Sequence, residues 1–132
     1  MDIEILKIAS DTKNHKVLDN CTHKSKQKNP LCGDEMEISV KVVKDQIHDF
    51  GYQCKSCIFC QASVSVLSNF SINNNISNID KAIIFFETFF QNEEVKIPKE
   101  YKKFEALFQK NNLSRKDCIL LPFKALNRAL KS

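Results

Sequence analysis

The clearest pattern in the chain is an alternation of apolar and polar residues over positions 36–42. Its apolar members are Met36, Ile38, Val40 and Val42. Side chains alternate between the two faces of a β-strand, so this spacing predicts a strand with one buried face. A second strand is predicted over 47–54, with Lys44-Asp45 as the turn between them. The two strands are therefore expected to form an antiparallel hairpin.

After the hairpin, apolar residues recur about every four positions, which predicts helices. One helix begins at Cys57 and continues to about Phe70. A second is predicted over 79–90, preceded at 77–80 by a pattern that resembles a capping box. Pro98 marks a break, and a shorter helix with Phe104, Leu107 and Phe108 follows and ends at Asn111-Asn112.

Helices are also expected towards both ends of the chain. Residues 2–10 have the mixed apolar spacing of a short amphipathic helix. Near the C-terminus, Ser114 is predicted to cap a helix that has Cys118 in its first turn. Pro122 cannot donate a hydrogen bond to the Cys118 carbonyl, so we expect a kink or a late helix start there.

The segment 11–28 is polar and predicts a loop, or a weak edge strand around Val17-Leu18. Lys24, Lys26 and Lys28 are expected to lie in a solvated part of it. Cys21 and His23 stand two residues apart in this segment, but no second pair of metal ligands accompanies them. We therefore expect both to lie in the loop without binding metal.

The composition of the chain excludes several classes of protein. A chain of 132 residues with 42% hydrophobic residues is expected to form one domain, residues 1–132, with a core of its own. Its six cysteines follow no secretory signal, which favours reduced thiols in the cytoplasm over disulfides. No apolar run is long enough to span a membrane. The net charge of +4 is scattered, so nucleic acid is not an expected partner.

The chemically distinctive stretch is Asn29-Pro30-Leu31-Cys32-Gly33-Asp34. Gly33 allows the backbone conformation that brings the Cys32 thiol and the Asp34 carboxylate together. These two groups are half of a tetrahedral site. Cys57 and Cys118 are candidates for the other half, because each is predicted at a helix start, where free N–H groups favour a thiolate. The four residues form a candidate Cys₃Asp metal site.

These residues resemble a known family. The matching motifs are Asn29-Pro30-x-Cys32-Gly33-Asp34, Cys57 followed by Ala62-Ser63-x-Ser65, and Arg115-x-x-Cys118 followed by Leu121-x-x-Lys124-Ala125-Leu126. In this order they are similar to the iron–sulfur cluster assembly scaffolds of the IscU/NifU N-terminal type, over residues 29–131. The long interval between Cys57 and Cys118 is similar to that of the SufU branch.

The resemblance implies an α+β fold, with a small antiparallel sheet packed against several helices. It also implies that Cys32, Cys57, Cys118 and Asp34 hold iron, a nascent [2Fe–2S] cluster or Zn²⁺. One cysteine, Cys32 or Cys118, would accept persulfide sulfur. The partners it implies are a cysteine desulfurase and apo-proteins that receive the cluster. Asp34, an oxygen ligand harder than a thiolate, is expected to be the labile ligand.

The chain departs from the IscU pattern at two places. Asp117 stands where a histidine precedes the last cysteine, and the Leu-Pro-Pro-Val-Lys chaperone-docking motif is missing. Three functions therefore stay open: a cluster scaffold, a zinc-bound sulfurtransferase that relays persulfide, and a structural zinc domain. A non-enzymatic scaffold is favoured. A hydrolase is disfavoured, because no motif places a base beside a nucleophile.

Two further cysteines form a C-x-x-C-x-x-C pattern with Cys57, namely Cys54 and Cys60. No fourth cysteine and proline follow at the offset that a ferredoxin-type cluster needs. For both residues, a role as a small buried hydrophobic side chain is favoured over a role as a ligand or a resolving thiol.

Overall fold

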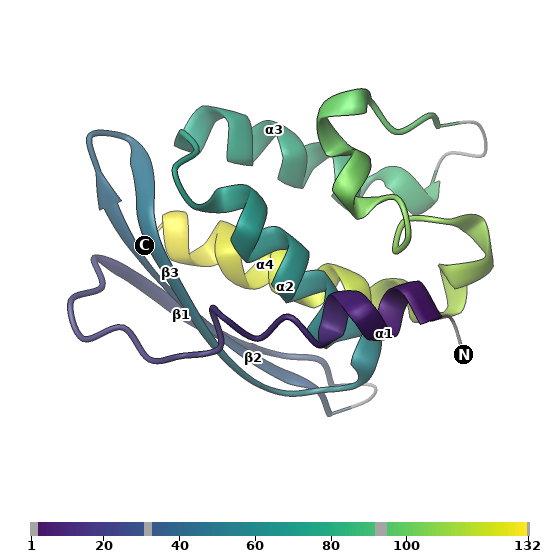
Figure 1. The fold of residues 1–132 in the computed structure, drawn as a ribbon, viewed down its shortest axis with the longest axis horizontal. Helices are drawn as coiled ribbons and strands as arrows, with labels where there is room; N and C mark the ends of the chain where they lie inside the picture. Colours follow the sequence, from purple (N-terminus) through teal and green to yellow (C-terminus); the bar gives the residue numbers. More distant parts are fainter. Residues whose placement is uncertain (1–2, 31–32, 92–94, 132) are drawn as a thin grey trace.

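The structure is a computed structural model that describes residues 3–30, 33–91 and 95–131. Within these ranges, the strands form one sheet and the helices pack on one of its faces, as Figure 1 shows. The α+β class expected from the sequence, a small antiparallel sheet packed against several helices, is confirmed.

The sheet has three strands in the order β1-β2-β3, and both neighbouring pairs are antiparallel. The strands are β1 (His23–Lys28), β2 (Glu35–Val43) and β3 (Gln46–Lys55). The last two form the predicted hairpin. Its turn residues Lys44 and Asp45 have φ angles of 51° and 63°, the left-handed conformation that a two-residue type I′ turn requires.

Strand β1 corrects the expectation of a solvated loop over Lys24, Lys26 and Lys28. The three lysines point to solvent, while the alternate side chains of the strand are half-buried. Ser25 faces the last helix, where its hydroxyl donates to the carbonyl of Ala125 at 2.6 Å. The sequence did not predict this strand, because its inward-facing residues are polar. It therefore shows no alternation of apolar and polar residues.

The weak strand expected at Val17-Leu18 is wrong, since this segment is not a strand. It belongs instead to a loop that follows the free edge of β3. The Tyr52 N–H donates to the Asn14 carbonyl at 3.1 Å. A Cβ atom at Gly51 would lie only 2.6 Å from the Lys16 carbonyl oxygen. The absence of a side chain at Gly51 therefore lets this loop pass close to the strand.

The helices supply the rest of the core. They are α1 (Ile3–Ala9), α2 (Ile58–Ser71), α3 (Ile76–Glu87) and α4 (Lys116–Leu130). Helix α2 packs against α1 and α4, and α4 packs on strands β1 and β2. The apolar faces predicted for the hairpin, α2 and α3 all meet in one hydrophobic cluster. None of the helices in the described ranges is long and apolar enough to cross a membrane.

Two helix starts differ from expectation. Helix α3 begins at Ile76, and Asn75 caps it by accepting a hydrogen bond from the Asn78 N–H at 2.7 Å. The pattern at 77–80 is therefore not the cap. Helix α4 has Arg115 at its N-cap without a capping side chain, so Ser114 does not cap it.

Pro122 lies inside α4, so the late start that we considered is wrong. The chain between α3 and α4 also differs from the predicted short helix around Phe104 and Phe108. It forms 3₁₀ turns, η1 (Phe89–Gln91), η2 (Lys99–Phe104) and η3 (Lys110–Arg115). Phe104 and Phe108 are nevertheless buried, with ring centroids 4.7 and 4.2 Å from that of Phe86.

Candidate metal centre

Three of the four predicted ligands come together in the structure. Asp34 precedes β2, Cys57 precedes α2, and Cys118 lies in the first turn of α4. One carboxylate oxygen and the two sulfur atoms lie within 4.8 Å of one another. The fourth predicted ligand, Cys32, lies outside the described residues.

A tight turn presents Asp34. The Asn29 N–H donates to the Asp34 carbonyl, and the Gly33 N–H donates to the Asn29 carbonyl, both at 2.8 Å. Gly33 has a φ of 78°, a conformation that side-chain-bearing residues resist. The unusual backbone conformation expected at Gly33 is therefore present, while its effect on Cys32 lies outside the described residues. The carbonyl of Asp34 is held by a hydrogen bond within the turn, and the side chain of Asp34 takes no part in these two hydrogen bonds.

Cys57 is the N-cap residue of α2. Its backbone is extended, its carbonyl accepts the first helical bond, from Gln61, at 3.0 Å, and its side chain makes no capping hydrogen bond. Serine, threonine or asparagine at this position would satisfy a free helical N–H. The thiol of Cys57 is instead free to act as a ligand or nucleophile.

A serine ties the two thiol-bearing helices together. The Ser63 hydroxyl on α2 donates to the carbonyl of Ile119 on α4 at 2.5 Å, beside Cys118. Ser65 instead donates to the Asp11 carbonyl, at 2.9 Å, and so ties α2 to the chain after α1. The sequence analysis named the Ala62-Ser63-x-Ser65 motif but did not foresee that its first serine joins these two helices.

The carboxylate of Asp34 is buried, with 8% of the residue exposed. Its Oδ2 atom has no hydrogen-bond partner. Buried polar atoms normally have a hydrogen-bond partner, so a partner that the chain itself does not supply is expected for this oxygen. A cation held between it and two thiolates would supply one, and the donor set fits iron or zinc.

Cys54 and Cys60 lie near these ligands. Burial raises the pKa of both thiols, a hydrogen bond with the Ser56 side chain lowers each pKa in part, and the negative charge of Asp34 raises each pKa further. Cys60 is fully buried, as a small hydrophobic side chain would be. Cys54 is only half-buried. Raised pKa values keep both thiols protonated, which makes them poorer metal ligands than a free thiolate.

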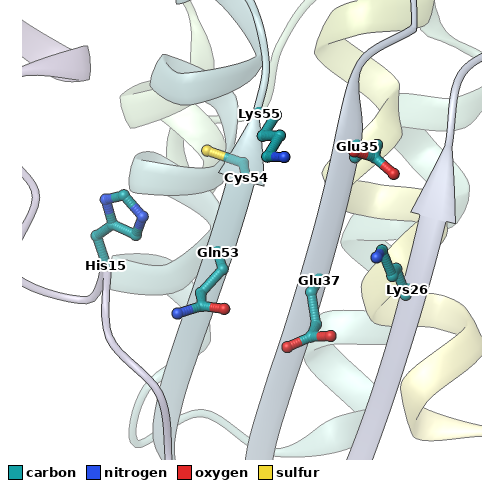
Figure 2. A pocket seen from close by; sticks show the side chains of 7 residues that line it. All are labelled: His15, Lys26, Glu35, Glu37, Gln53, Cys54 and Lys55. Atoms are coloured by element: carbon teal, nitrogen blue, oxygen red, sulfur yellow. The ribbon is translucent and has the colours of Figure 1, made fainter.

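Cys54 borders a cavity of about 350 Å³ on the outer side of the sheet. Figure 2 shows its other lining residues: His15, Lys26, Glu35, Glu37, Gln53 and Lys55. The ring of His15 stacks on that of Tyr52, with centroids 5.1 Å apart. Charges of both signs line the cavity, so it does not select cations or anions by net charge.

The other predicted features are not part of this group of ligand atoms. Cys21 lines a small cavity with Val17 and Leu18, as expected for a loop cysteine. The nearby His23 ring contacts the Thr22 hydroxyl at 2.7 Å. Asp117, in place of the family histidine, is half-buried in the first turn of α4 and lines a cavity of about 220 Å³ with Asn29 and Pro30.

Comparisons with known proteins place the chain in a family. The family model described as the NifU-like N-terminal domain matches residues 2–111. The iron–sulfur cluster assembly scaffold protein IscU of Thermotoga maritima is 29% identical over 127 residues, which cover 96% of this chain and 89% of that protein.

Two solved structures share the fold. A NifU-like N-terminal protein from Brucella abortus superposes with a TM-score of 0.89 at 18% identity, over 98% of this chain and 91% of that one. A protein described as a scaffold for the SUF system, from Fervidobacterium islandicum AW-1, superposes with a TM-score of 0.85 at 24% identity, over 98% and 96% of the two chains.

Proposed function

Because this chain belongs to the family of NifU-like N-terminal domains, a family of iron–sulfur cluster assembly scaffolds, we propose that it builds and delivers such a cluster. It accepts sulfur from a cysteine desulfurase, binds iron or a nascent [2Fe–2S] cluster, and transfers the cluster to apo-proteins. We propose further that residues 1–132 form one domain and act in the cytoplasm. The structural matches, which cover 98% of the chain, support the single domain.

One observation carries this proposal. Asp34, Cys57 and Cys118 are far apart in the sequence, yet their ligand atoms lie within 4.8 Å, and the buried Oδ2 of Asp34 lacks a partner. A site with no cation would leave a carboxylate at this position with an uncompensated cost of burial. We assign Cys32 as the fourth ligand, following the family motif.

The ligands differ in what they can do. The thiols of Cys32 and Cys118 are our candidates for accepting persulfide sulfur. The Asp34 carboxylate binds a soft metal less strongly than a thiolate does, so it can dissociate and open a position. Incoming sulfur, or the thiol of a recipient protein, can then reach the metal. The site therefore suits a cargo that is assembled and released.

The same donors fit Zn²⁺, which supports a second candidate, a zinc-bound sulfurtransferase that relays persulfide. Metal analysis distinguishes the two. The protein is purified without oxygen, supplied with Fe²⁺, L-cysteine and a cysteine desulfurase, and assayed for iron, zinc and acid-labile sulfide. Iron with equimolar sulfide, followed by transfer to an apo-ferredoxin, supports the scaffold.

Two other results would contradict the scaffold. Zinc without sulfide, together with a persulfide on the protein, would identify the sulfurtransferase. Zinc that stays bound in a chain that accepts no sulfur would identify a structural zinc domain, the third function that the sequence leaves open.

A further inference from the structure

The two sulfur atoms of the candidate metal centre are close enough to react with each other. Cys57 is the N-cap residue of α2, Cys118 lies in the first turn of α4, and their sulfur atoms lie within 4.8 Å of each other. A disulfide forms when one sulfur attacks another, and it joins the two at about 2.05 Å. Rotation about the Cα–Cβ bonds moves the sulfurs and leaves the backbone in place, which is the movement that brings them into contact.

The helices that carry these sulfurs are held together by the fold. Helices α2 and α4 pack side by side, as Figure 1 shows. The Ser63 hydroxyl on α2 donates to the carbonyl of Ile119, the residue after Cys118, at 2.5 Å. Ser63 is fully buried, so water does not compete for this hydrogen bond. The separation of the two thiols is therefore set by helix packing rather than by a loop.

The two thiols differ in exposure. Cys57 is half-buried, whereas only 7% of Cys118 is exposed. Burial of Cys118 limits the attack of thiols in solution on a persulfide formed there. The Cys57 thiol is already beside it, inside the protein, so it is the nucleophile in the best position to attack that persulfide.

We propose that Cys57 is a resolving thiol in the metal-free chain, where it attacks a persulfide on Cys118 and discharges the outer sulfur as hydrosulfide. The inference rests on the proposed function, because the persulfide holds the sulfur that the chain accepts. It adds a reaction to that function, the reduction of sulfane sulfur to sulfide by the chain's own thiols. A metal ion bound through Cys57 occupies the same sulfur, so this reaction belongs to the chain without metal.

The chemistry balances without another electron donor. The Cys57 sulfur attacks the inner sulfur of the Cys118 persulfide, and the proton of the Cys57 thiol passes to solvent. The S–S bond of the persulfide breaks, and its electron pair leaves with the outer sulfur as hydrosulfide. A Cys57–Cys118 disulfide forms. The two cysteine sulfurs supply two electrons in total, and the sulfane sulfur takes up both.

The disulfide also sets a condition for the next cycle. Two of the proposed metal ligands are joined in it, so they bind no metal until a reductant separates them. A dithiol reductant restores both thiols by thiol–disulfide exchange. The discharged chain can then take up metal or accept another sulfur.

The test uses the full, metal-free chain without oxygen. The reduced protein is mixed with less than one equivalent of glutathione persulfide, and hydrosulfide is trapped from the moment of mixing with a fluorescent alkylating agent. Intact mass and peptide mapping distinguish a retained persulfide, which adds one sulfur atom, from an internal disulfide, which removes two hydrogen atoms. The mapping also identifies which cysteines carry each modification.

Wild type is compared with Cys57→Ser and with two control variants, Cys54→Ser and Cys60→Ala. Serine is a preferred N-cap residue, so Cys57→Ser should keep the start of α2. The controls each remove a thiol that is not part of the close group of ligand atoms. Far-ultraviolet circular dichroism verifies that all four proteins are folded.

We expect wild type and both controls to release hydrosulfide and to form the Cys57–Cys118 disulfide. Cys57→Ser should keep the added sulfur as a persulfide on Cys118 and lose the release.

Several results overturn this inference and leave the scaffold proposal intact. They are a wild type that keeps its persulfide or forms a disulfide through another cysteine, and a Cys57→Ser protein that releases hydrosulfide as fast as wild type. If Cys57→Ser alone gains no sulfur, Cys57 is the acceptor and not the resolving thiol. If no protein gains sulfur, sulfur acceptance itself fails, and the inference fails with it.

Discussion

An oxygen of Asp34 and the sulfur of Cys118 lie within 4.8 Å of each other, although Asp34 follows a glycine turn and Cys118 lies in the first turn of the last helix. The contact joins the turn before β2 to the first turn of α4. Cys57 completes the group from the start of α2. A metal bound here would connect three elements of the fold, so metal binding should stabilise the fold as well as carry the chemistry.

The cysteines of this group should be required for metal retention. Cys57→Ser and Cys118→Ser each remove a thiolate, and we expect the bound metal to fall sharply in both. Bound iron or zinc is measured by elemental analysis after desalting without oxygen. Cys21→Ser is the control, because Cys21 lies with Val17 and Leu18 and should retain full metal.

Cys32→Ser tests the ligand that falls outside the described residues. The family motif predicts the same loss of metal as for the other two cysteines. Retention at the level of the Cys21→Ser control would remove Cys32 from the ligand set and leave the fourth position to another group.

Removal of Asp34 should stabilise the metal-free protein. Its Oδ2 atom is buried without a partner, and a buried unpaired acceptor costs about 1–3 kcal/mol. We therefore expect Asp34→Ala to raise the free energy of unfolding of the metal-free chain, measured by chemical denaturation. Ser71→Ala is a matched control that removes another unpartnered buried oxygen away from the ligands and should act in the same direction. A less stable Asp34→Ala protein would mean that the carboxylate is paired in solution.

The same substitution should slow delivery. Without the carboxylate, only the thiolates hold the cargo, and the opening that dissociation of Asp34 gives to a recipient thiol is lost. We expect loaded Asp34→Ala to transfer cluster or sulfur more slowly than wild type while keeping more metal than the cysteine variants. Equal loss of metal, with transfer no slower than wild type, would refute the labile role of Asp34.

Sequence patterns predicted the parts of the fold that have an apolar period. The hairpin was found because Met36, Ile38 and Val40 alternate with polar residues, and all three are buried. Strand β1 was missed because His23 and Ser25 face inward and are polar. Its position is set by contacts with α4, such as the hydrogen bond from Ser25 to Ala125, which no local pattern contains.

The sequence likewise predicted a part of the candidate metal site. Helix starts and a glycine turn pointed to Asp34, Cys57 and Cys118, and the structure brings their ligand atoms together. The sequence analysis did not foresee the burial of Asp34, because no local pattern around this turn indicates it.

Gly51 should tolerate no side chain. A Cβ atom would lie 2.6 Å from the carbonyl oxygen of Lys16, and a backbone atom cannot move aside as a flexible side chain can. We expect Gly51→Ala to lower the free energy of unfolding by about 1–3 kcal/mol, as overpacked sites do. His48→Ala, at an exposed position of the same strand, is the control for thermal melting. Equal melting temperatures would show that the loop over β3 moves away at little cost.

The last prediction separates the two serines of the Ala62-Ser63-x-Ser65 motif. Both are buried and each donates one hydrogen bond to a backbone carbonyl, so replacing either with alanine should cost about 0.5–1.5 kcal/mol of stability. Only Ser63 joins α2 to α4, the helices that carry Cys57 and Cys118. Ser65 joins α2 to Asp11, away from the ligands.

Metal affinity should therefore respond to one serine and not the other. In Ser63→Ala the first turn of α4 loses its tie to α2, the two thiols are held less firmly at a common distance, and the dissociation constant for metal should rise. Ser65→Ala should lose similar stability and keep the affinity of wild type. Competition with a chelator of known affinity measures both constants, and urea denaturation of the metal-free proteins measures stability. If the two variants lose affinity equally, the effect follows from general destabilisation, and the assignment of Ser63 as a positioning residue for the thiols is wrong.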